Sequence, residues 1–249
     1  MRLKDYQSGA LDTLSAYLKI LSESAERGLK AHAAIASLPE DVRASIPAPP
    51  EATVVAWDET RKSGIAASSD PWRALSDGAS RSIPHSCLKL PTGGGKTLLA
   101  AHCVDRILVS HFRQTTGFVL WIVPSEAIYT QTKKQLADRG HPIRQTLDRA
   151  SGGRVKILEK LDGFTRQDVE EKLCVLLLML QSTGRENKET LKVFQDSGHY
   201  TSFFPQDDPA ARTQLLIQIP NLSGLTWRKR PLAAKARRGS SKASVTHCA

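Results

Sequence analysis

The stretch LKLPTGGGKTLLAAH, Leu88–His102, places three consecutive glycines between a short apolar segment and a helix-forming run. Residues 87–90, CLKL, are predicted to form a strand, and residues 97–110 a helix. Glycines let backbone N–H groups converge on an anion, and the N-terminus of a helix favours negative charge there. This order predicts a site for the phosphates of a nucleotide. The expected cradle is Thr92, Gly93, Gly94 and Gly95, with Lys96 on the outer phosphates and Thr97 as a ligand of Mg²⁺.

Position 90 departs from the usual phosphate-loop pattern. G-x-x-x-x-G-K-[ST] requires glycine where this chain has Leu90, so the strict pattern fails at one position. A plain glycine-rich turn before an amphipathic helix is the structural alternative. It accounts less well for a Lys-Thr pair placed directly after the glycines.

The flanking sequence predicts an α/β fold. FVLWIVP (118–124) and CVLLLMLQS (174–182) are nearly continuous apolar runs, expected to form strands buried on both faces, and residues 153–161 are a further strand. A helix is expected over 125–140 with Ser125 as its N-cap, and a short one over 168–173. Strands alternating with helices predict a mainly parallel sheet flanked by helices.

Four regions are expected along the chain. Leucines at three- and four-residue spacing predict a helix over 1–34, and prolines and small polar residues predict loops and short helices in an insertion over 35–85. The nucleotide-binding domain would occupy 86–222, with later helices over 186–198 and 208–220. The tail, 223–249, is expected to be disordered; it carries seven of the 35 Lys and Arg residues that give the net charge of +10.

Composition narrows the class of protein. No apolar run approaches the roughly 20 residues that cross a bilayer, and the N-terminus has no apolar signal core. The four cysteines lack the spacing of metal ligands. A cytoplasmic protein with reduced thiols and no membrane segment is the expectation.

Three stretches together resemble one family. PTGGGKT is similar to the first motif of superfamily 2 helicases, and LKLPTGGGKTLLAA resembles the helicase subunit of type III restriction enzymes and its DEAD/DEAH-like relatives. LKDYQSGAL (3–11) resembles the segment in which a glutamine, here Gln7, reads adenine. LWIVPSEAIYTQT (120–132) resembles a motif that touches the nucleic-acid backbone, here through Ser125 and Gln131. The structural alternatives are a packed Tyr6 beside a solvated Gln7, and a Ser125 that serves only as a cap.

The resemblance implies a partial RecA-like P-loop NTPase domain. Its implied cofactors are ATP and Mg²⁺, its implied activity is ATP-dependent action on duplex DNA as a helicase or translocase, and its implied partner is a modification (methyltransferase) subunit of the larger machine. An ATPase of this class also needs an Asp-Glu pair at the end of a strand. The candidates Asp58-Glu59, Glu170-Glu171 and Asp207-Asp208 all lie in the wrong context for that pair.

The family resemblance also implies a second RecA-like domain, which the sequence does not show. These two missing features predict the truncated front part of a motor, with hydrolysis near background. No acid follows Asp208, and the abrupt change of composition near Leu222–Trp227 suggests a shifted reading frame or an early stop. Two other readings stay open. The chain could be a non-catalytic nucleotide- or nucleic-acid-binding module whose basic tail contacts phosphates. A P-loop kinase is a poorer alternative, because neither a base nor a lid can be named.

Overall fold

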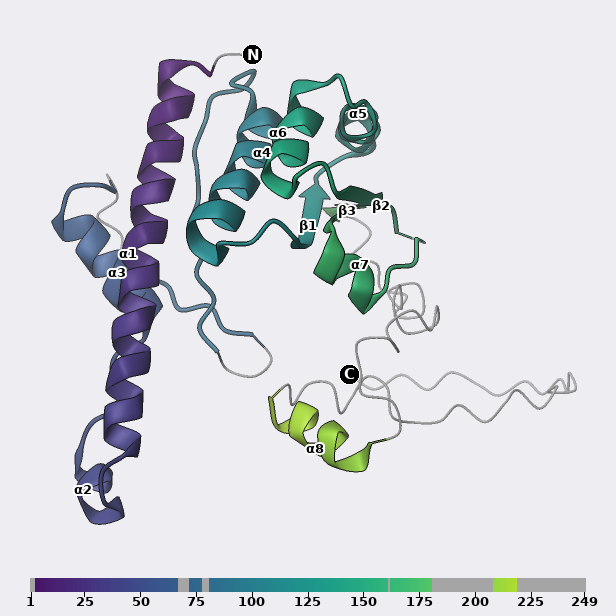
Figure 1. The fold of residues 1–249 in the computed structure, drawn as a ribbon. Helices are drawn as coiled ribbons and strands as arrows, with labels where there is room; N and C mark the ends of the chain where they lie inside the picture. The colour runs from purple at the N-terminus through teal and green to yellow at the C-terminus, as the bar shows by residue number, and fades with distance from the viewer. Residues whose placement is uncertain (1–2, 67–71, 78–80, 161, 181–207, 219–249) are drawn as a thin grey trace, which may run out of the picture.

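The computed structural model describes residues 3–66, 72–77, 81–160, 162–180 and 208–218 (Figure 1). Helices and strands alternate after the first hundred residues, as expected for an α/β fold. In chain order the elements are α1 (Asp5–Ala36), α2 (Glu40–Ser45), α3 (Ala52–Lys62), α4 (Lys96–Arg106), the π-helix η1 (Ile107–Phe112), β1 (Gly117–Val123), α5 (Glu126–Ala137), α6 (Pro142–Ser151), β2 (Val155–Leu158), α7 (Arg166–Glu171), β3 (Leu173–Met179) and α8 (Pro209–Gln218).

The three described strands form one parallel sheet. The order is β1-β3-β2, so β3 is central, with Gly117 of β1 and Val155 of β2 both opposite Leu173. The predicted parallel sheet flanked by helices is therefore confirmed. β3 is buried on both faces over Leu173–Leu177, because helices or loops cover it on each side.

The sheet has two unequal faces. One face carries the main core, in which α4, α5 and α6 pack against alternate residues of the strands, such as Trp121, Val123, Val175 and Leu177. The other face carries a smaller core, where Phe164 and the half-buried Val169 of α7 pack on Cys174 and Leu176. The helices thus lie mostly on one side of the sheet.

β1 corrects one expectation from the sequence. Its apolar run predicted burial on both faces, but Phe118, Leu120 and Ile122 are 40%, 50% and 44% exposed. These side chains point to the sparsely covered face, where Phe118 stacks on Phe164 with ring centroids 5.0 Å apart. A continuous apolar run signals burial on both faces only if a full second layer is present. Here α7 and Phe164 reach β1 but leave these three side chains partly exposed.

The predicted strand over residues 87–90 is also wrong. These residues form no regular secondary structure and pair with no described strand, and Cys87 and Lys89 are exposed. A strand needs a neighbour for its backbone N–H and C=O groups. The alternating apolar pattern of CLKL gives half-buried Leu88 and Leu90 without a ladder partner among the described residues.

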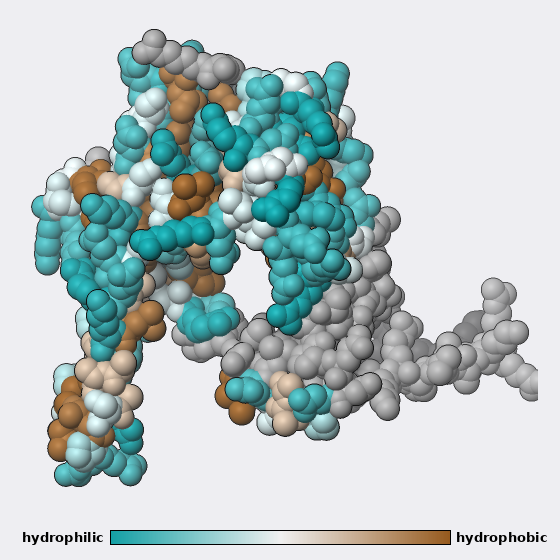
Figure 2. Space-filling model, viewed as in Figure 1, coloured by the Kyte–Doolittle hydropathy of each residue, from teal (hydrophilic) through white to brown (hydrophobic). Residues whose placement is uncertain are grey.

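α1 is long and lies beside the sheet domain rather than over the sheet (Figure 1). The predicted N-terminal helix is confirmed, and its buried stripe of Leu11, Leu14, Leu18 and Leu21 packs towards α3, α4 and η1. Ser22 also joins η1 through a 2.8 Å hydrogen bond with Nδ1 of His111. The end of α1 and the short α2 extend away from the rest and carry apolar side chains on their surface (Figure 2).

Most of the other predicted elements are confirmed, with small shifts. α5, β2, α7, β3 and α8 lie where the sequence predicts them, whereas the helix after the glycines changes to a π-helix at Ile107. α6 was not predicted. The helix expected over 186–198 and the basic tail lie outside the described residues. No helix in the described part is long and apolar enough to cross a membrane.

Candidate nucleotide-binding site

The glycine-rich loop forms a tight turn whose backbone is left-handed at two glycines. The Gly94 N–H donates to the Pro91 carbonyl at 3.1 Å, closing the turn. Gly93 and Gly95 have φ of 76° and 75°, in the left-handed region that favours glycine. A Cβ on Gly94 would lie 2.9 Å from the Pro91 oxygen, so a side chain there would displace backbone.

Helix α4 begins directly after this turn. Gly95 is its N-cap, and the first backbone hydrogen bond into α4 runs from the Leu99 N–H to the Gly95 carbonyl at 2.9 Å. Within the described part of the chain, the N–H groups of Lys96, Thr97 and Leu98 have no acceptor. Such a helix N-terminus binds anions through its free N–H groups and the helix dipole.

Lys96 and Thr97 occupy the first turn of α4. Lys96 is exposed, and no described residue forms an ion pair with its ammonium group. Thr97 is half-buried at the same helix end. A free ammonium group and a hydroxyl beside unpaired N–H groups are the donor set that a nucleotide phosphate and its Mg²⁺ require. The residues present therefore fit the phosphates of ATP.

The start of α1 is bound to this loop. The Gln7 side chain is only 5% exposed, and its Nε2 donates to the Gly94 carbonyl at 2.9 Å. Its Oε1 accepts from the Lys4 N–H at 3.0 Å. The Tyr6 hydroxyl donates to the same Gly94 carbonyl at 3.2 Å, although its side chain is 44% exposed. The structural alternative of a packed tyrosine beside a solvated glutamine is therefore wrong.

This contact orients the loop. The Gly94 carbonyl faces α1, and in a trans peptide the N–H of the next residue, Gly95, points the opposite way. A Cβ on Gly95 would lie 2.6 Å from Gln7 Nε2, so a side chain there would displace the Gln7 amide from this contact. Gln7 keeps one amide hydrogen and one oxygen lone pair beyond these bonds, which is the capacity that an adenine edge needs.

Ser125 and the phosphate loop lie at the same end of the sheet. α4 continues directly into η1, whose Leu108 lies 3.8 Å from the position that a Cβ on Gly117 would occupy. The end of α4 is therefore near the beginning of β1. The start of α4 therefore points towards the carboxyl end of β1, where Ser125 follows the strand (Figure 1). Gln131 is exposed in the middle of α5. No hydrogen bond joins Ser125 or Gln131 to the described loop, residues 91–97.

Ser125 does stand at the N-cap of α5, as predicted, but its side chain makes no capping hydrogen bond. Its exposed hydroxyl is thus available at this end of the sheet. The cap position alone does not explain why serine occupies it.

Each of the acidic pairs Asp58-Glu59, Glu170-Glu171 and Asp207-Asp208 has at least one carboxylate bound to a group outside the nucleotide site. Glu59 on α3 forms an ion pair with Arg27 of α1 at 2.7 Å. Glu170 pairs with Arg166 at 2.6 Å along α7. Asp208 accepts from the Ala210 N–H at the start of α8 at 2.9 Å. In the described part of the chain, no group of three His, Cys, Asp or Glu side chains could hold a metal ion.

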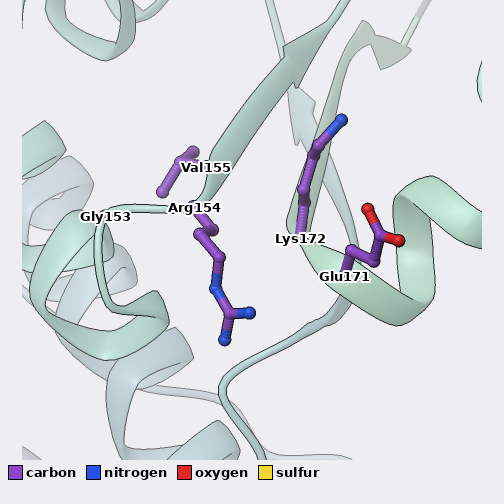
Figure 3. Close-up of a pocket in the computed structure, with 5 residues that line it drawn as sticks. All are labelled: Gly153, Arg154, Val155, Glu171 and Lys172. Carbon is purple, nitrogen blue, oxygen red and sulfur yellow. The ribbon is translucent and has the colours of Figure 1, made fainter.

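A separate hollow lies at the opposite end of the sheet. Gly153, Arg154, Val155, Glu171 and Lys172 line it, where β2 and β3 begin (Figure 3). The phosphate loop faces the carboxyl ends of the strands, so this hollow is distinct from the nucleotide site.

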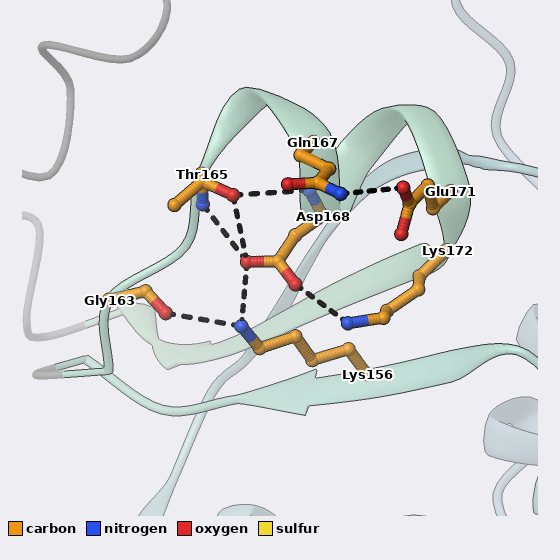
Figure 4. Close-up of polar contacts among 7 residues, drawn as sticks. All are labelled: Lys156, Gly163, Thr165, Gln167, Asp168, Glu171 and Lys172. Carbon is orange, nitrogen blue, oxygen red and sulfur yellow. Dashed lines mark hydrogen bonds and ion pairs between the residues drawn. The ribbon is translucent and has the colours of Figure 1, made fainter.

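Beside this hollow, Asp168 joins α7 to the sheet. Its carboxylate accepts from Lys156 at 2.8 Å, from Lys172 at 2.9 Å and from the Thr165 N–H at 3.1 Å (Figure 4). These two ammonium groups hold the pKa of Asp168 well below its usual range. The Oδ2 atom of Asp168 also accepts from the Thr165 hydroxyl at 3.2 Å. Four donors from β2, the start of α7 and the residue after α7 thus bind one carboxylate, which gives the cluster a structural role.

The parallel sheet, the left-handed glycines and the free start of α4 define a RecA-like P-loop nucleotide-binding domain. The family model described as "Type III restriction enzyme, res subunit" matches residues 1–201. The chain belongs to this family, and it contains a superfamily 2 helicase-like ATP-binding module. No curated protein and no solved structure matches the chain.

Proposed function

We propose that this chain binds ATP and Mg²⁺ at the turn between residues 91 and 97. The observation that carries the proposal is the Gly94 carbonyl, which α1 holds away from the free N–H groups of α4. Gly93, Gly94 and Gly95 with Thr92 cradle the phosphates, Lys96 contacts the outer phosphates, and Gln7 binds the adenine edge. Mg²⁺ bound at Thr97 neutralises phosphate charge.

The experiment is a binding titration with a fluorescent ATP analogue. Lys96→Ala removes the ammonium group and is expected to weaken binding at least tenfold. Lys134→Ala, an exposed lysine on α5, is the matched control and leaves binding unchanged. Thr97→Ala lowers the Mg²⁺ dependence of binding, and Thr97→Ser retains it. Equal affinities for Lys96→Ala and the wild type would contradict the proposal.

We further propose that the module serves ATP-dependent action on duplex DNA. Ser125 is exposed at the end of the sheet that carries the phosphate loop, and Gln131 is exposed on α5, which starts there. In this proposal both side chains contact the DNA backbone. A modification methyltransferase subunit is the proposed partner, and the cytoplasm the proposed location. Ser125→Ala with Gln131→Ala is expected to weaken DNA binding without changing ATP affinity. Unchanged DNA affinity in this double variant argues against the proposed contact.

Hydrolysis by this chain alone is proposed to be near background. The strand β3 is followed by Leu180, Gln181 and Ser182 rather than by an Asp-Glu pair. Without a carboxylate to position the attacking water, bound ATP lacks a main source of acceleration. A phosphate-release assay with and without duplex DNA tests this, and robust DNA-stimulated turnover contradicts it.

The alternative function is a non-catalytic nucleotide- or nucleic-acid-binding module. Seven Lys or Arg residues without an acid over residues 226–249 favour it. DNA affinity that falls steeply with salt, and loses that dependence when residues 226–249 are deleted, supports this alternative.

A further inference from the structure

Basic side chains gather at the amino end of the sheet, which is the end opposite the phosphate loop. They come from the helix ends and loops that lead into the three strands, and we call this set the amino-end basic surface: Arg106, Arg113, Arg149, Arg154 and Lys172. The strands begin in register, since Gly117 of β1 and Val155 of β2 both lie opposite Leu173 of β3. The loops before them are therefore neighbours, at the strand spacing of about 5 Å.

Arg154 is fixed over this end of the sheet. Its Nη2 donates to the Thr115 hydroxyl at 3.2 Å. Because β3 lies between β2 and β1, this bond carries the Arg154 side chain from the start of β2 past the start of β3 to the loop before β1. The guanidinium group lines the hollow at the start of β2 and β3 together with Lys172 (Figure 3). A planar guanidinium held in this way is well placed to bind a phosphate group.

The positive charge of this surface is only partly offset. Within the described residues, none of its four arginines forms an ion pair. The carboxylate of Glu171, which also lines the hollow, accepts from Gln167 Nε2 at 2.7 Å and is not paired with Arg154. Asp105, at the end of α4, is a second acid at this end of the sheet. Four arginines against these two carboxylates leave a net positive charge, which attracts anions.

The helix dipole explains only part of this arrangement. Arg149 stands in the last turn of α6 and Arg113 directly follows η1, where a cation is stabilised by the negative end of a helix. Arg154 belongs to no helix, so the dipole does not account for it. Arg113 has φ of 52°, in the left-handed conformation that glycine usually supplies at a helix end. An arginine at this position keeps a positive charge where glycine would be the easier residue.

An exposed aromatic ring adjoins the basic surface. Phe112, next to Arg113 at the end of η1, is 56% exposed, and its ring meets that of His111 edge-on with centroids 4.9 Å apart. Cations beside an exposed ring are the groups to which single-stranded nucleic acids bind, with phosphates on the cations and bases stacked on the ring. An acidic peptide would be attracted by the same cations but would have no base to place on the ring.

We propose that the amino-end basic surface binds single-stranded nucleic acid. Arg113 and Arg154 bind backbone phosphates, and a base stacks on Phe112. The surface lies at the opposite end of the sheet from Ser125 and the phosphate loop, so this contact is separate from the DNA contact proposed above and does not depend on it.

Fluorescence anisotropy of the full-length chain with a labelled oligothymidine strand, measured over a range of salt concentrations, tests the proposal. Arg113→Gln combined with Arg154→Gln is expected to weaken binding about tenfold at low salt and to reduce the slope of log affinity against log salt by about 1–2. The control is Arg43→Gln combined with Arg61→Gln, at exposed positions of α2 and α3. It removes the same charge and should change neither quantity.

Phe112→Ala is expected to weaken binding of the single strand about tenfold and to leave binding of a duplex of matching length unchanged. This uncharged variant keeps the test valid if the double arginine variant fails to fold. The proposal is overturned if the double arginine variant binds like its control, or if Phe112→Ala binds the single strand like the wild type. Competition by oligoglutamate as strong as that by the oligonucleotide would also overturn it and assign the surface to an acidic peptide. The effect of the arginine variant should persist in a Ser125→Ala, Gln131→Ala background, which distinguishes the two proposed contacts.

Discussion

The Gln7 amide and the Gly94 carbonyl, 87 positions apart in the sequence, are joined by a 2.9 Å hydrogen bond in the interior of the protein. Through this bond the first turn of α1 becomes part of the phosphate loop. Gln7 therefore has a structural role in the site in addition to its proposed contact with adenine. The loop, α1 and α4 act as one unit, and changes at Gln7 should affect both stability and nucleotide binding.

Gln7→Ala is expected to lower the free energy of unfolding by about 1–2 kcal/mol, because a buried carbonyl loses a donor and the Lys4 N–H loses an acceptor. ATP affinity should fall as well, since the loop is no longer held. Urea unfolding and nucleotide titration measure the two effects. Tyr6→Phe, which removes the longer and more exposed bond, should cost less in both. A Gln7→Ala protein with wild-type stability contradicts the structural role.

Gly95→Ala is expected to be more disruptive than an ordinary left-handed glycine replacement. The left-handed backbone alone costs a non-glycine residue about 1–2 kcal/mol. At Gly95 the new Cβ would also meet Gln7 Nε2 at 2.6 Å. Gly153→Ala is the matched control, because Gly153 has φ of 81° but no atom within 4 Å of the Cβ position. Thermal unfolding separates the two contributions, and equal losses of stability would show that the Gln7 contact is unimportant.

Local patterns predicted the elements of this fold well, because their signals are contained in single segments. The leucine spacing of α1 and the apolar run of β3 are examples. α6 was missed although it has local signals of its own. Pro142 stands at its first turn and Gly152, with φ of 64°, at its end, which is the usual placement of these two residues.

The features that the sequence did not reveal depend on distant partners. The burial of Gln7 depends on Gly94, and the exposure of one face of β1 depends on how little of it α7 and Phe164 cover. CLKL has the composition of a strand, but no strand in the described part of the chain pairs with it. In the candidate site, the residues of the loop were therefore predictable, whereas the attachment of α1 through the Gly94 carbonyl was not.

Asp168→Asn is expected to destabilise the protein in a pH-dependent way. The ammonium groups of Lys156 and Lys172 lower the pKa of Asp168 in the folded state. The resulting stabilisation is fully present above the unfolded pKa of about 4 and is lost as the pH falls towards the folded pKa. At pH 7 the variant should lose about 1–2 kcal/mol of unfolding free energy, and the difference from the wild type should shrink below roughly pH 4.

Urea unfolding at pH 7 and at pH 3 measures this difference. Glu170→Gln is the control, because its pair with Arg166 is exposed and should contribute little at either pH. A loss of stability in Asp168→Asn that is the same at both pH values would argue against the ion-pair explanation.

Arg144→Ala is expected to be among the most destabilising substitutions on the main-core side. Arg144 is 6% exposed and is held by Asp148 at 2.9 Å, while it donates to the carbonyls of Leu136 at 3.0 Å and Val155 at 3.4 Å. It thus connects α6 to the end of α5 and to the start of β2. Its removal leaves these acceptors buried or half-buried without their donor, at a cost of about 2–4 kcal/mol.

Arg144→Lys should recover only part of this loss, since an ammonium group cannot reproduce the planar arrangement of three guanidinium donors. Arg149→Ala, an exposed arginine on the same helix, controls for the loss of positive charge and should leave the unfolding midpoint nearly unchanged. ATP affinity measured below the unfolding temperature should be unaffected in all three variants. The partners of Arg144, which are Asp148, Leu136 and Val155, do not belong to the phosphate loop. If Arg144→Ala and Arg149→Ala unfolded at the same temperature, the buried hydrogen bonds of Arg144 would not be what fixes α6 against the sheet.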